Sequence, residues 1–217
     1  MYREWQGANL KTEALYGFSI DGAPVVYSNQ GLHFWEGAAV WTGGDKPPRL
    51  QLKRGFQKGK WGIYSRDEVL AHEAVHLARM CFDEPRFEEL LAYRVSESRF
   101  RRYWGPLFRR PSEVWFFLGA LVIGFWGTLF LHGAFWGVPL IPVLFCGVKL
   151  VRDQRCLERC IEKVGPKVAI CLKDEEIEAV AGLETVAAYL SDDGTLRRRL
   201  LCKINAETPR RNFTLSF

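Results

Sequence analysis

The amino-acid sequence predicts an α+β protein that carries a transmembrane helical hairpin. Three observations lead to this fold class: short β-like segments separated by turn residues over residues 14–65, capped helical periodicity over residues 66–95, and an almost uninterrupted apolar run over residues 114–148. A chain of 217 residues is long enough for one small domain and a membrane segment. We therefore expect three parts, which are a catalytic domain over residues 1–110, a transmembrane hairpin over residues 111–150 and a helical C-terminal region over residues 151–217.

The first part of the chain is expected to form a small, mostly antiparallel sheet. Its β-like segments are separated by clusters of Gly, Asp, Asn and Lys, which favour turns. The segments are LYGFSI, APVVYS, GAAVWT, RLQLKRGF and WGIYS. The first 17 residues have no apolar core of the signal-peptide type, so we expect this domain to remain in the cytoplasm.

Two helices are predicted to follow the sheet. Ser65 and Glu68 form a capping box, in which the Ser65 hydroxyl accepts from the Glu68 amide and the Glu68 carboxylate reaches back. This places a first helix from Arg66 to about Cys81. Pro85 suits the first turn of a second helix, because its fixed backbone angle matches a helix and its missing N–H is not needed there.

The apolar run is expected to cross a membrane twice. Its 35 residues are too many for one crossing of about 20 residues, and Gly133 and Gly137 supply a turn near its middle. Basic residues flank the run on both sides, namely Arg99, Arg101, Arg102, Arg109, Arg110, Lys149, Arg152, Arg155, Arg159 and Lys163. Since positive charge favours the cytoplasmic side, both flanks are predicted to be cytoplasmic. The alternative, a hairpin buried in a soluble core, is disfavoured by the length of the uncharged run.

The C-terminal region is predicted to be helical and to lie, with both chain ends, in the cytoplasm. A charged helix is expected over residues 151–164, as a continuation of the hairpin. A second helix is expected over residues 175–190 with Asp174 as its cap, and a basic helix over residues 196–204.

Composition excludes several classes of protein. The net charge of +5 is mild, and the arginine clusters come with no nucleic-acid recognition motif, so we expect no nucleic-acid partner. The clusters are better explained by their position beside the hairpin. The six cysteines match no zinc ribbon or disulfide framework, which indicates reduced thiols in the cytosol.

Residues 72–76 read His-Glu-Ala-Val-His, a spacing that suits a catalytic zinc ion. On a helix, His72 and His76 lie about 40° and 6 Å apart on one face. Two neutral imidazoles at this separation can bind one tetrahedral zinc ion, and Glu73 beside them can act as a general base. The helix's apolar stripe lies about 160° away, which disfavours burial of the histidines in the main core. The alternative is a pair of ordinary surface histidines, but the chain has only four.

The second helix offers a third metal ligand. Glu89 points almost opposite the apolar stripe of this helix, whereas Glu88 lies between its two faces, so Glu89 is the better ligand. Ala92 removes bulk where the two helices must approach. Asp83 and Glu84 are more remote and are better explained as capping groups.

The pattern of residues 72–76 followed by Glu89-Leu90-Leu91-Ala92 resembles that of the gluzincin zinc metallopeptidases, which is HExxH followed by ExxA on a second helix. Within this class the layout is similar to membrane metallopeptidases of the CAAX-prenyl endopeptidase type and to the minigluzincins. The resemblance implies His72, His76 and Glu89 as ligands of Zn²⁺ and Glu73 as the general base. It also implies that a strand ahead of the active-site helix, GAAVWT or WGIYS, binds the substrate in an extended form.

The chain departs from this family pattern in two ways. Many relatives carry an Asp directly after ExxA that orients a ligating histidine, and this chain has Tyr93 there. The 13-residue step from His76 to Glu89 is short for the class.

These features lead to one expected function and one alternative. We expect a membrane-anchored zinc metallopeptidase that acts on protein or peptide substrates, including membrane-associated ones, with Tyr93, Arg94 and His33 as candidate donors to the scissile carbonyl. The alternative is a catalytically inactive gluzincin-like membrane scaffold or adaptor.

Overall fold

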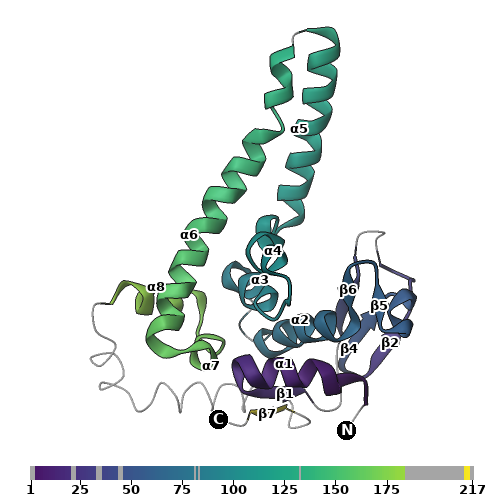
Figure 1. The fold of residues 1–217 in the computed structure, drawn as a ribbon, viewed down its shortest axis with the longest axis vertical. Helices are drawn as coiled ribbons and strands as arrows, with labels where there is room; N and C mark the ends of the chain where they lie inside the picture. The colour runs from purple at the N-terminus through teal and green to yellow at the C-terminus, as the bar shows by residue number, and fades with distance from the viewer. Residues whose placement is uncertain are drawn as a thin grey trace.

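The protein consists of a folded α+β body from which a long helical hairpin projects (Figure 1). The structure is a computed structural model and describes residues 3–20, 23–32, 36–43, 46–80, 82, 84–131, 133–183 and 213–215. The predicted α+β class is confirmed. The predicted helix over residues 196–204 and the end of the helix predicted over residues 175–190 lie outside the described residues.

The α-helices are α1 (Gln6–Tyr16), α2 (Arg66–Arg79), α3 (Pro85–Tyr93), α4 (Arg99–Trp104), α5 (Pro111–Phe130), α6 (Leu140–Val164), α7 (Pro166–Ala169) and α8 (Asp174–Gly182). The strands are β1 (Phe18–Ile20), β2 (Val25–Tyr27), β3 (Ala38–Gly43), β4 (Lys46–Leu52), β5 (Lys60–Trp61), β6 (Tyr64–Ser65) and β7 (Phe213–Leu215). Short 3-10 helices occupy Arg3–Trp5, Arg54–Lys58, Gly105–Leu107 and Gly133–Gly137.

The main sheet has three strands in the order β2-β4-β3 and is mixed. The prediction of a mostly antiparallel sheet was therefore wrong in this respect. Strand β4 returns from β3 as an antiparallel hairpin, but it enters between β3 and β2 and runs parallel to β2. The parallel pairing joins Val25 to Leu50, residues that are far apart in the sequence, so the local pattern of the segments carried no sign of it.

Three of the predicted β-segments have other boundaries than expected. In RLQLKRGF the strand ends at Leu52, and Arg54–Lys58 forms a 3-10 helix. The segment LYGFSI is divided, because Leu15 and Tyr16 end α1 and only Phe18–Ile20 forms a strand. Gly17 lies between them with φ of 74°, a left-handed conformation that glycine adopts without strain and that ends the helix. The segment WGIYS is also divided, by a tight turn at Gly62 between the two-residue strands β5 and β6.

The core is continuous from the N-terminal helices to the C-terminal region. Helix α1 packs on α2, and α2 packs on α3. The Tyr16 hydroxyl, fully buried, donates to the Leu91 backbone oxygen at 2.6 Å and joins α1 to α3. Leu150 and Leu157 from α6 and residues 169–172 enter the same core. The C-terminal region therefore supports the helices that carry the HExxH and ExxA motifs.

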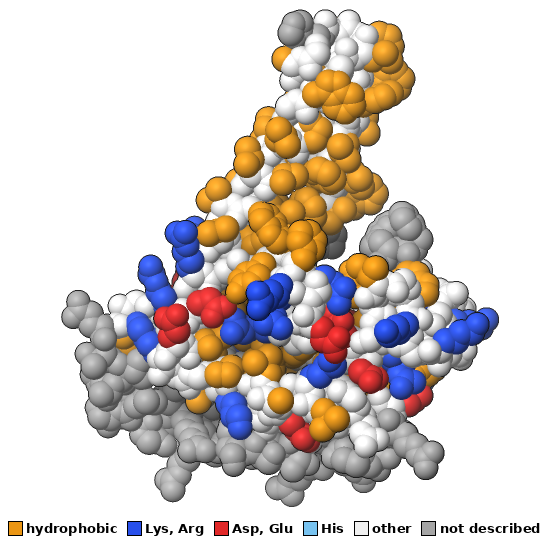
Figure 2. Space-filling model, viewed as in Figure 1, with side chains coloured by type: hydrophobic (Ala, Val, Ile, Leu, Met, Phe, Trp, Pro, Cys, Tyr) orange, Lys and Arg blue, Asp and Glu red, His pale blue; other side chains and the backbone are white. Residues whose placement is uncertain are grey.

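Helices α5 and α6 form the hairpin, and both are long and apolar enough to cross a membrane. The helices contact each other and meet at a turn around Gly133–Gly137 (Figure 1). A Cβ atom at Gly127 would lie 2.2 Å from the Phe135 ring, so glycine is needed for the tip to pack against α5. Outward-facing side chains of α5, and of α6 as far as Val148, are almost all apolar (Figure 2). The predicted hairpin is thus confirmed as a structural element.

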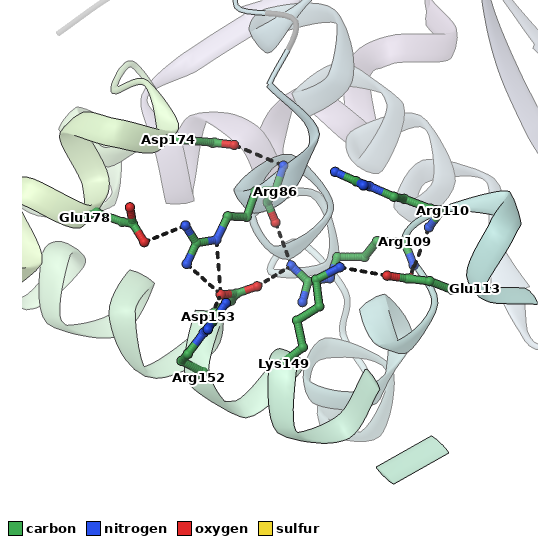
Figure 3. A network of polar contacts seen from close by, with 9 residues as sticks. All are labelled: Arg86, Arg109, Arg110, Glu113, Lys149, Arg152, Asp153, Asp174 and Glu178. Carbon is green, nitrogen blue, oxygen red and sulfur yellow. Dashed lines mark hydrogen bonds and ion pairs between the residues drawn. The ribbon is translucent and has the colours of Figure 1, made fainter. Parts of the chain in front are cut away.

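A network of ion pairs holds the base of the hairpin to the body (Figure 3). The buried carboxylate of Asp153 on α6 accepts from Arg86 at 2.9 Å and from Arg109 at 2.8 Å. Glu113, in the first turn of α5, accepts from the Arg109 backbone N–H at 2.7 Å and from Lys149 at 2.7 Å. These contacts join α3, α5 and α6 at one level of the molecule.

Candidate metal centre

Helix α2 presents the HExxH motif at the side of the core. It begins as predicted at Arg66, where the Ser65 hydroxyl accepts from the Glu68 N–H at 3.1 Å. Its opposite face is fully buried, which fixes the rotation of the helix. At its other end, the buried guanidinium of Arg79 donates to the backbone oxygens of Ile170 and Leu172 at 2.9 and 2.8 Å. The helix is therefore held at both ends.

Helix α3 brings the predicted third ligand to the same place. Pro85 occupies its first turn, as the sequence predicts, and the helix packs on α2 through a buried face that includes Leu91 and Ala92. The small side chain of Ala92 permits the close approach. Glu88 and Glu89 then lie on the side of α3 that faces the histidines.

The three predicted ligands come together. His72 Nε2 and His76 Nε2 are 3.2 Å apart. Glu89 places one carboxylate oxygen 3.6 Å from His72 Nε2 and the other 3.5 Å from His76 Nε2. One ligand atom from each residue thus lies within 4.8 Å of the others, and the group can hold a metal ion. All three side chains are partly buried, with 20–30% of their surface exposed.

These separations match a tetrahedral metal site. Ligands bound at about 2.0–2.1 Å with tetrahedral angles lie roughly 3.3–3.4 Å from one another. The two imidazole nitrogens are 3.2 Å apart, and each lies 3.5 or 3.6 Å from a different oxygen of Glu89, so the separations are close to this range. Two imidazoles and one carboxylate also form a ligand set typical of catalytic zinc, in which a fourth position stays open. The residues present therefore fit the ion that the motif implies.

Glu88 has a role that the sequence did not reveal. Its carboxylate lies 2.5 Å from His76 Nδ1, the ring nitrogen that faces away from the metal position. A carboxylate bound to the far nitrogen of a ligating histidine fixes its tautomer and orientation and makes it a stronger ligand. The contact of Glu88 with His76 is comparable to the one that the motif's family makes with an Asp after ExxA. The signal was its position between the two faces of α3, next to the ligand Glu89.

His72 is oriented by the second helix as well. It makes a hydrogen bond with the backbone of Ala92. The Tyr93 ring lies edge-on against the His72 ring, with centroids 4.7 Å apart. Gly105 makes room for this ring, because a Cβ there would lie 2.3 Å from it. Tyr93 therefore packs against a ligand as an aromatic wall.

The protonation of the site reflects burial and an excess of carboxylates. Burial, helped by the charge of His76, lowers the pKa of His72 to about 3. Burial opposes the charge of His76, but the hydrogen bond to Glu88 and the charges of Glu73 and Glu89 outweigh it and raise its pKa to about 9. Burial raises the pKa of Glu73 to about 7, against the effect of His76. The carboxyls of Glu73, Glu88 and Glu89 surround the single cationic ring of His76, and this arrangement favours the binding of a further cation.

Glu73 and His72 line a pocket of about 200 Å³ beside the metal position. Aromatic and aliphatic side chains form most of its wall, which comprises Phe56, Trp61, Tyr64, Val69, Tyr93 and Val95. Gly37 and Ala38, at the start of β3, also line it. Strand β3 is at the edge of its sheet, so of the two predicted substrate-binding segments GAAVWT lies beside the site as a continuous strand.

A polar cluster closes one end of this pocket. The Glu68 carboxylate accepts from Arg101 Nη2 at 2.7 Å and from the buried Ser96 hydroxyl. The predicted return of the Glu68 side chain to the start of α2 is therefore replaced by contacts with the segment around α4. This cluster connects the wall of the pocket to the arginines that precede the hairpin.

The remaining candidates lie elsewhere. Arg94 pairs with Glu158 of α6, so it is engaged away from the ligands, and His33 lies outside the described residues. The Glu84 side chain makes no capping hydrogen bond at the start of its own helix α3; it accepts from the Asp174 N–H at 2.6 Å, at the start of α8. Asp83 lies outside the described residues. Asp174 does not cap α8 but accepts from Arg79 and the Arg86 backbone.

Comparisons of the chain with known protein families, with curated proteins and with solved structures found no match. The assignment of the site therefore depends on its geometry and on the motif.

Proposed function

We propose that this protein is a membrane-anchored zinc metallopeptidase. The observation that carries the proposal is the cluster of His72, His76 and Glu89, whose imidazole nitrogens lie 3.2 Å apart and each within 3.6 Å of one oxygen of the Glu89 carboxylate. Three further features support the proposal: the contact of Glu88 with His76, the position of Glu73 outside the ligand set, and the pocket beside the metal position.

Glu73 is the general base in this proposal. A zinc ion held by the three ligands supplies Lewis acidity, which makes water acidic near neutral pH and polarises a carbonyl. Glu73 accepts a proton from the attacking water and passes it to the leaving amine. Its pKa of about 7 in the metal-free site suits a group that both accepts and returns a proton near neutrality.

The pocket and the hairpin together suggest the class of substrate. An extended peptide can add to the edge of β3, which among the described strands pairs with β4 alone, while one apolar side chain enters the aromatic pocket. We propose that the hairpin crosses the membrane with both ends cytoplasmic, an arrangement that would hold the site close to the bilayer. Membrane-associated or juxtamembrane polypeptides are then the favoured substrates.

The first test is the metal content of the full chain, extracted in mild detergent and measured by mass spectrometry of its elements. One zinc ion per chain is expected, and His72→Ala should lose it. Purified protein that neither contains zinc nor takes it up would contradict the proposal.

The second test separates binding from catalysis. Wild type and Glu73→Gln are incubated with a peptide mixture from a digested proteome, and new peptide ends are identified by mass spectrometry. The variant should retain zinc and lose about 10²–10⁴-fold in rate. Glu97→Gln is the matched control, because Glu97 is 67% exposed and pairs with Lys11 away from the pocket.

The inactive scaffold is the alternative, and Tyr93 in place of an orienting Asp is the feature that favours it. It predicts a protein that binds zinc through the same residues and cleaves no peptide. In that case Glu73→Gln and wild type behave alike in the peptide assay, whereas His72→Ala still lowers thermal stability.

A further inference from the structure

A large groove in the described part of the chain lies apart from the candidate metal centre. It has a volume of about 1040 Å³ and lies between α6, the end of α4 and α8. Trp104, half exposed, stands at its wall. None of the described residues that line it belongs to the metal site, so the proposed peptidase activity gives it no role.

The groove is apolar at one end and basic at the other. Towards the hairpin tip its lining is apolar, with Val143, Leu144, Gly147, Val148 and Val151. One to two turns further along α6 it is lined by Arg152, Arg155 and Arg159. At 100° per residue, Leu144, Val148, Arg155 and Arg159 fall within about 60° of one another on the helix. One face of α6 thus changes from apolar to basic along its length.

Two carboxylates near the basic end are already bound by arginines. Asp153 is buried and shared between Arg86 and Arg109, and Glu178 is bound by Arg86. Within the described part of the chain, Arg155 and Arg159 have no carboxylate at ion-pair distance, and both are exposed. Figure 2 shows basic side chains along the lower part of α6, directly below its apolar part.

The change from apolar to basic side chains on α6 lies at the same level as the end of the apolar surface on α5. Lys149 and Glu113 pair at this level, and the α5 side chains beyond it are apolar and exposed. Leu144 and Arg155 are eleven residues apart, or about 16 Å along the helix. This is the distance from the hydrocarbon into the headgroup region of a bilayer whose hydrocarbon core is about 30 Å thick. Trp104 lies beside this transition, as aromatic residues at bilayer interfaces do.

We propose that this groove binds one anionic phospholipid of the surrounding bilayer. The headgroup phosphate contacts Arg155 and Arg159, and an acyl chain lies along Leu144, Gly147 and Val148. A soluble anion would leave the apolar half without a role. A polypeptide would bring backbone N–H and C=O groups against a wall of aliphatic side chains and glycine, which offers them no side-chain hydrogen bonds.

The test uses the full chain in vesicles of phosphatidylcholine with a minor fraction of phosphatidylglycerol. After extraction in mild detergent, native mass spectrometry counts the lipids that remain bound. Phosphatidylglycerol should be enriched by at least about tenfold over its share of the vesicle, since each basic residue near the surface favours anionic lipid by about 1 kcal/mol. The double variant Arg155→Glu/Arg159→Glu should lose the enrichment, whereas Arg54→Glu/Lys58→Glu, the same charge change at exposed sites of the body, should keep it.

A second pair of variants tests the acyl half without changing charge. Gly147→Leu fills the groove, and Gly119→Leu adds the same side chain on α5; a Cβ at either position meets nothing within 4 Å. Only Gly147→Leu should reduce bound phosphatidylglycerol, with both variants unfolding at the wild-type temperature.

Three results would overturn the proposal. The first is equal retention of phosphatidylglycerol and phosphatidylcholine by the wild type. The second is displacement of the bound species by inorganic phosphate together with no effect of Gly147→Leu, which indicates a soluble-anion site. The third is a photo-crosslinker at position 148 that labels peptide and no lipid, which indicates a polypeptide site.

Discussion

The metal centre and the base of the hairpin both bury charged side chains, but they balance the charges differently. At the hairpin base each buried carboxylate meets its cations directly, as Asp153 meets Arg86 and Arg109. At the metal centre Glu73, Glu88 and Glu89 surround two imidazoles that carry at most one proton at neutral pH. The first arrangement is complete within the chain, whereas the second has a deficit of positive charge. This difference distinguishes the structural ion pairs at the hairpin base from the candidate metal centre, which we propose binds a cation.

Removing the charge of Asp153 at the hairpin base should lower the stability of the protein more than any other change predicted here. Asp153→Asn leaves the guanidinium of Arg109, which is 3% exposed, and that of Arg86 without their shared carboxylate. We expect a loss of about 3–5 kcal/mol in the free energy of unfolding, since a buried charge then lacks its partner. Denaturant unfolding of the full chain in detergent measures it. Glu178→Gln is the control, because Glu178 is 50% exposed and should contribute less than about 1 kcal/mol.

Zinc should stabilise the folded protein, because the centre lacks positive charge. At a free zinc concentration about 100 times the dissociation constant, the gain is about 2.7 kcal/mol. His72→Ala should abolish this gain. Asp153→Asn should keep most of the gain, although its free energy of unfolding without zinc is lower than that of the wild type. A zinc-dependent gain that survives in His72→Ala would place the ion elsewhere.

Removing the partner of His76 should weaken the centre without destroying it. Glu88→Gln keeps the size of the side chain but loses the charge that holds His76, so zinc affinity should fall about 10–100-fold. Competition with a chelator of known affinity measures this change. An unchanged affinity would show that Glu88 does not orient the ligand.

The pH dependence of zinc binding should be set by His76. Its pKa of about 9 means that it is protonated at neutral pH and must lose that proton to bind zinc. Affinity should therefore fall about tenfold for each unit by which the pH drops below this pKa. His72, with a pKa of about 3, has no proton to lose in this range. Chelator competition between about pH 6 and pH 8 distinguishes one released proton from none.

The sequence predicted the elements whose signals are local. The start of α2 follows from the Ser65 cap, the start of α3 from Pro85, and the hairpin from an apolar run with a turn at its centre. Helix α1 was missed because its buried face includes the polar residues Asn9 and Thr12, which blur the apolar periodicity. The parallel pairing of β2 and β4 was also missed, because the joining segment does not specify which side of the sheet the chain returns to.

The same distinction between local sequence signals and long-range packing holds for the candidate site. His72 and His76 follow from the geometry of one helix, and the choice of Glu89 over Glu88 as ligand agrees with the contacts. The contact between Glu88 and His76 could not be predicted, because it depends on the angle at which α3 crosses α2. The pairing of Asp153 with arginines from two other segments depends in the same way on tertiary packing.

Helix α6 has no break between the hairpin and the core. Its 25 residues form a rod of about 37 Å, with Leu144 at the apolar end and Leu157 inside the core. Hydrophobic mismatch tilts transmembrane helices, and a tilt of one half of a rod displaces the other half. With the hairpin in a membrane, as we propose, a change in bilayer thickness would tilt α6 and shift its lower half inside the folded body. Zinc affinity compared between short-chain and long-chain lipids would measure whether this shift reaches the candidate metal centre.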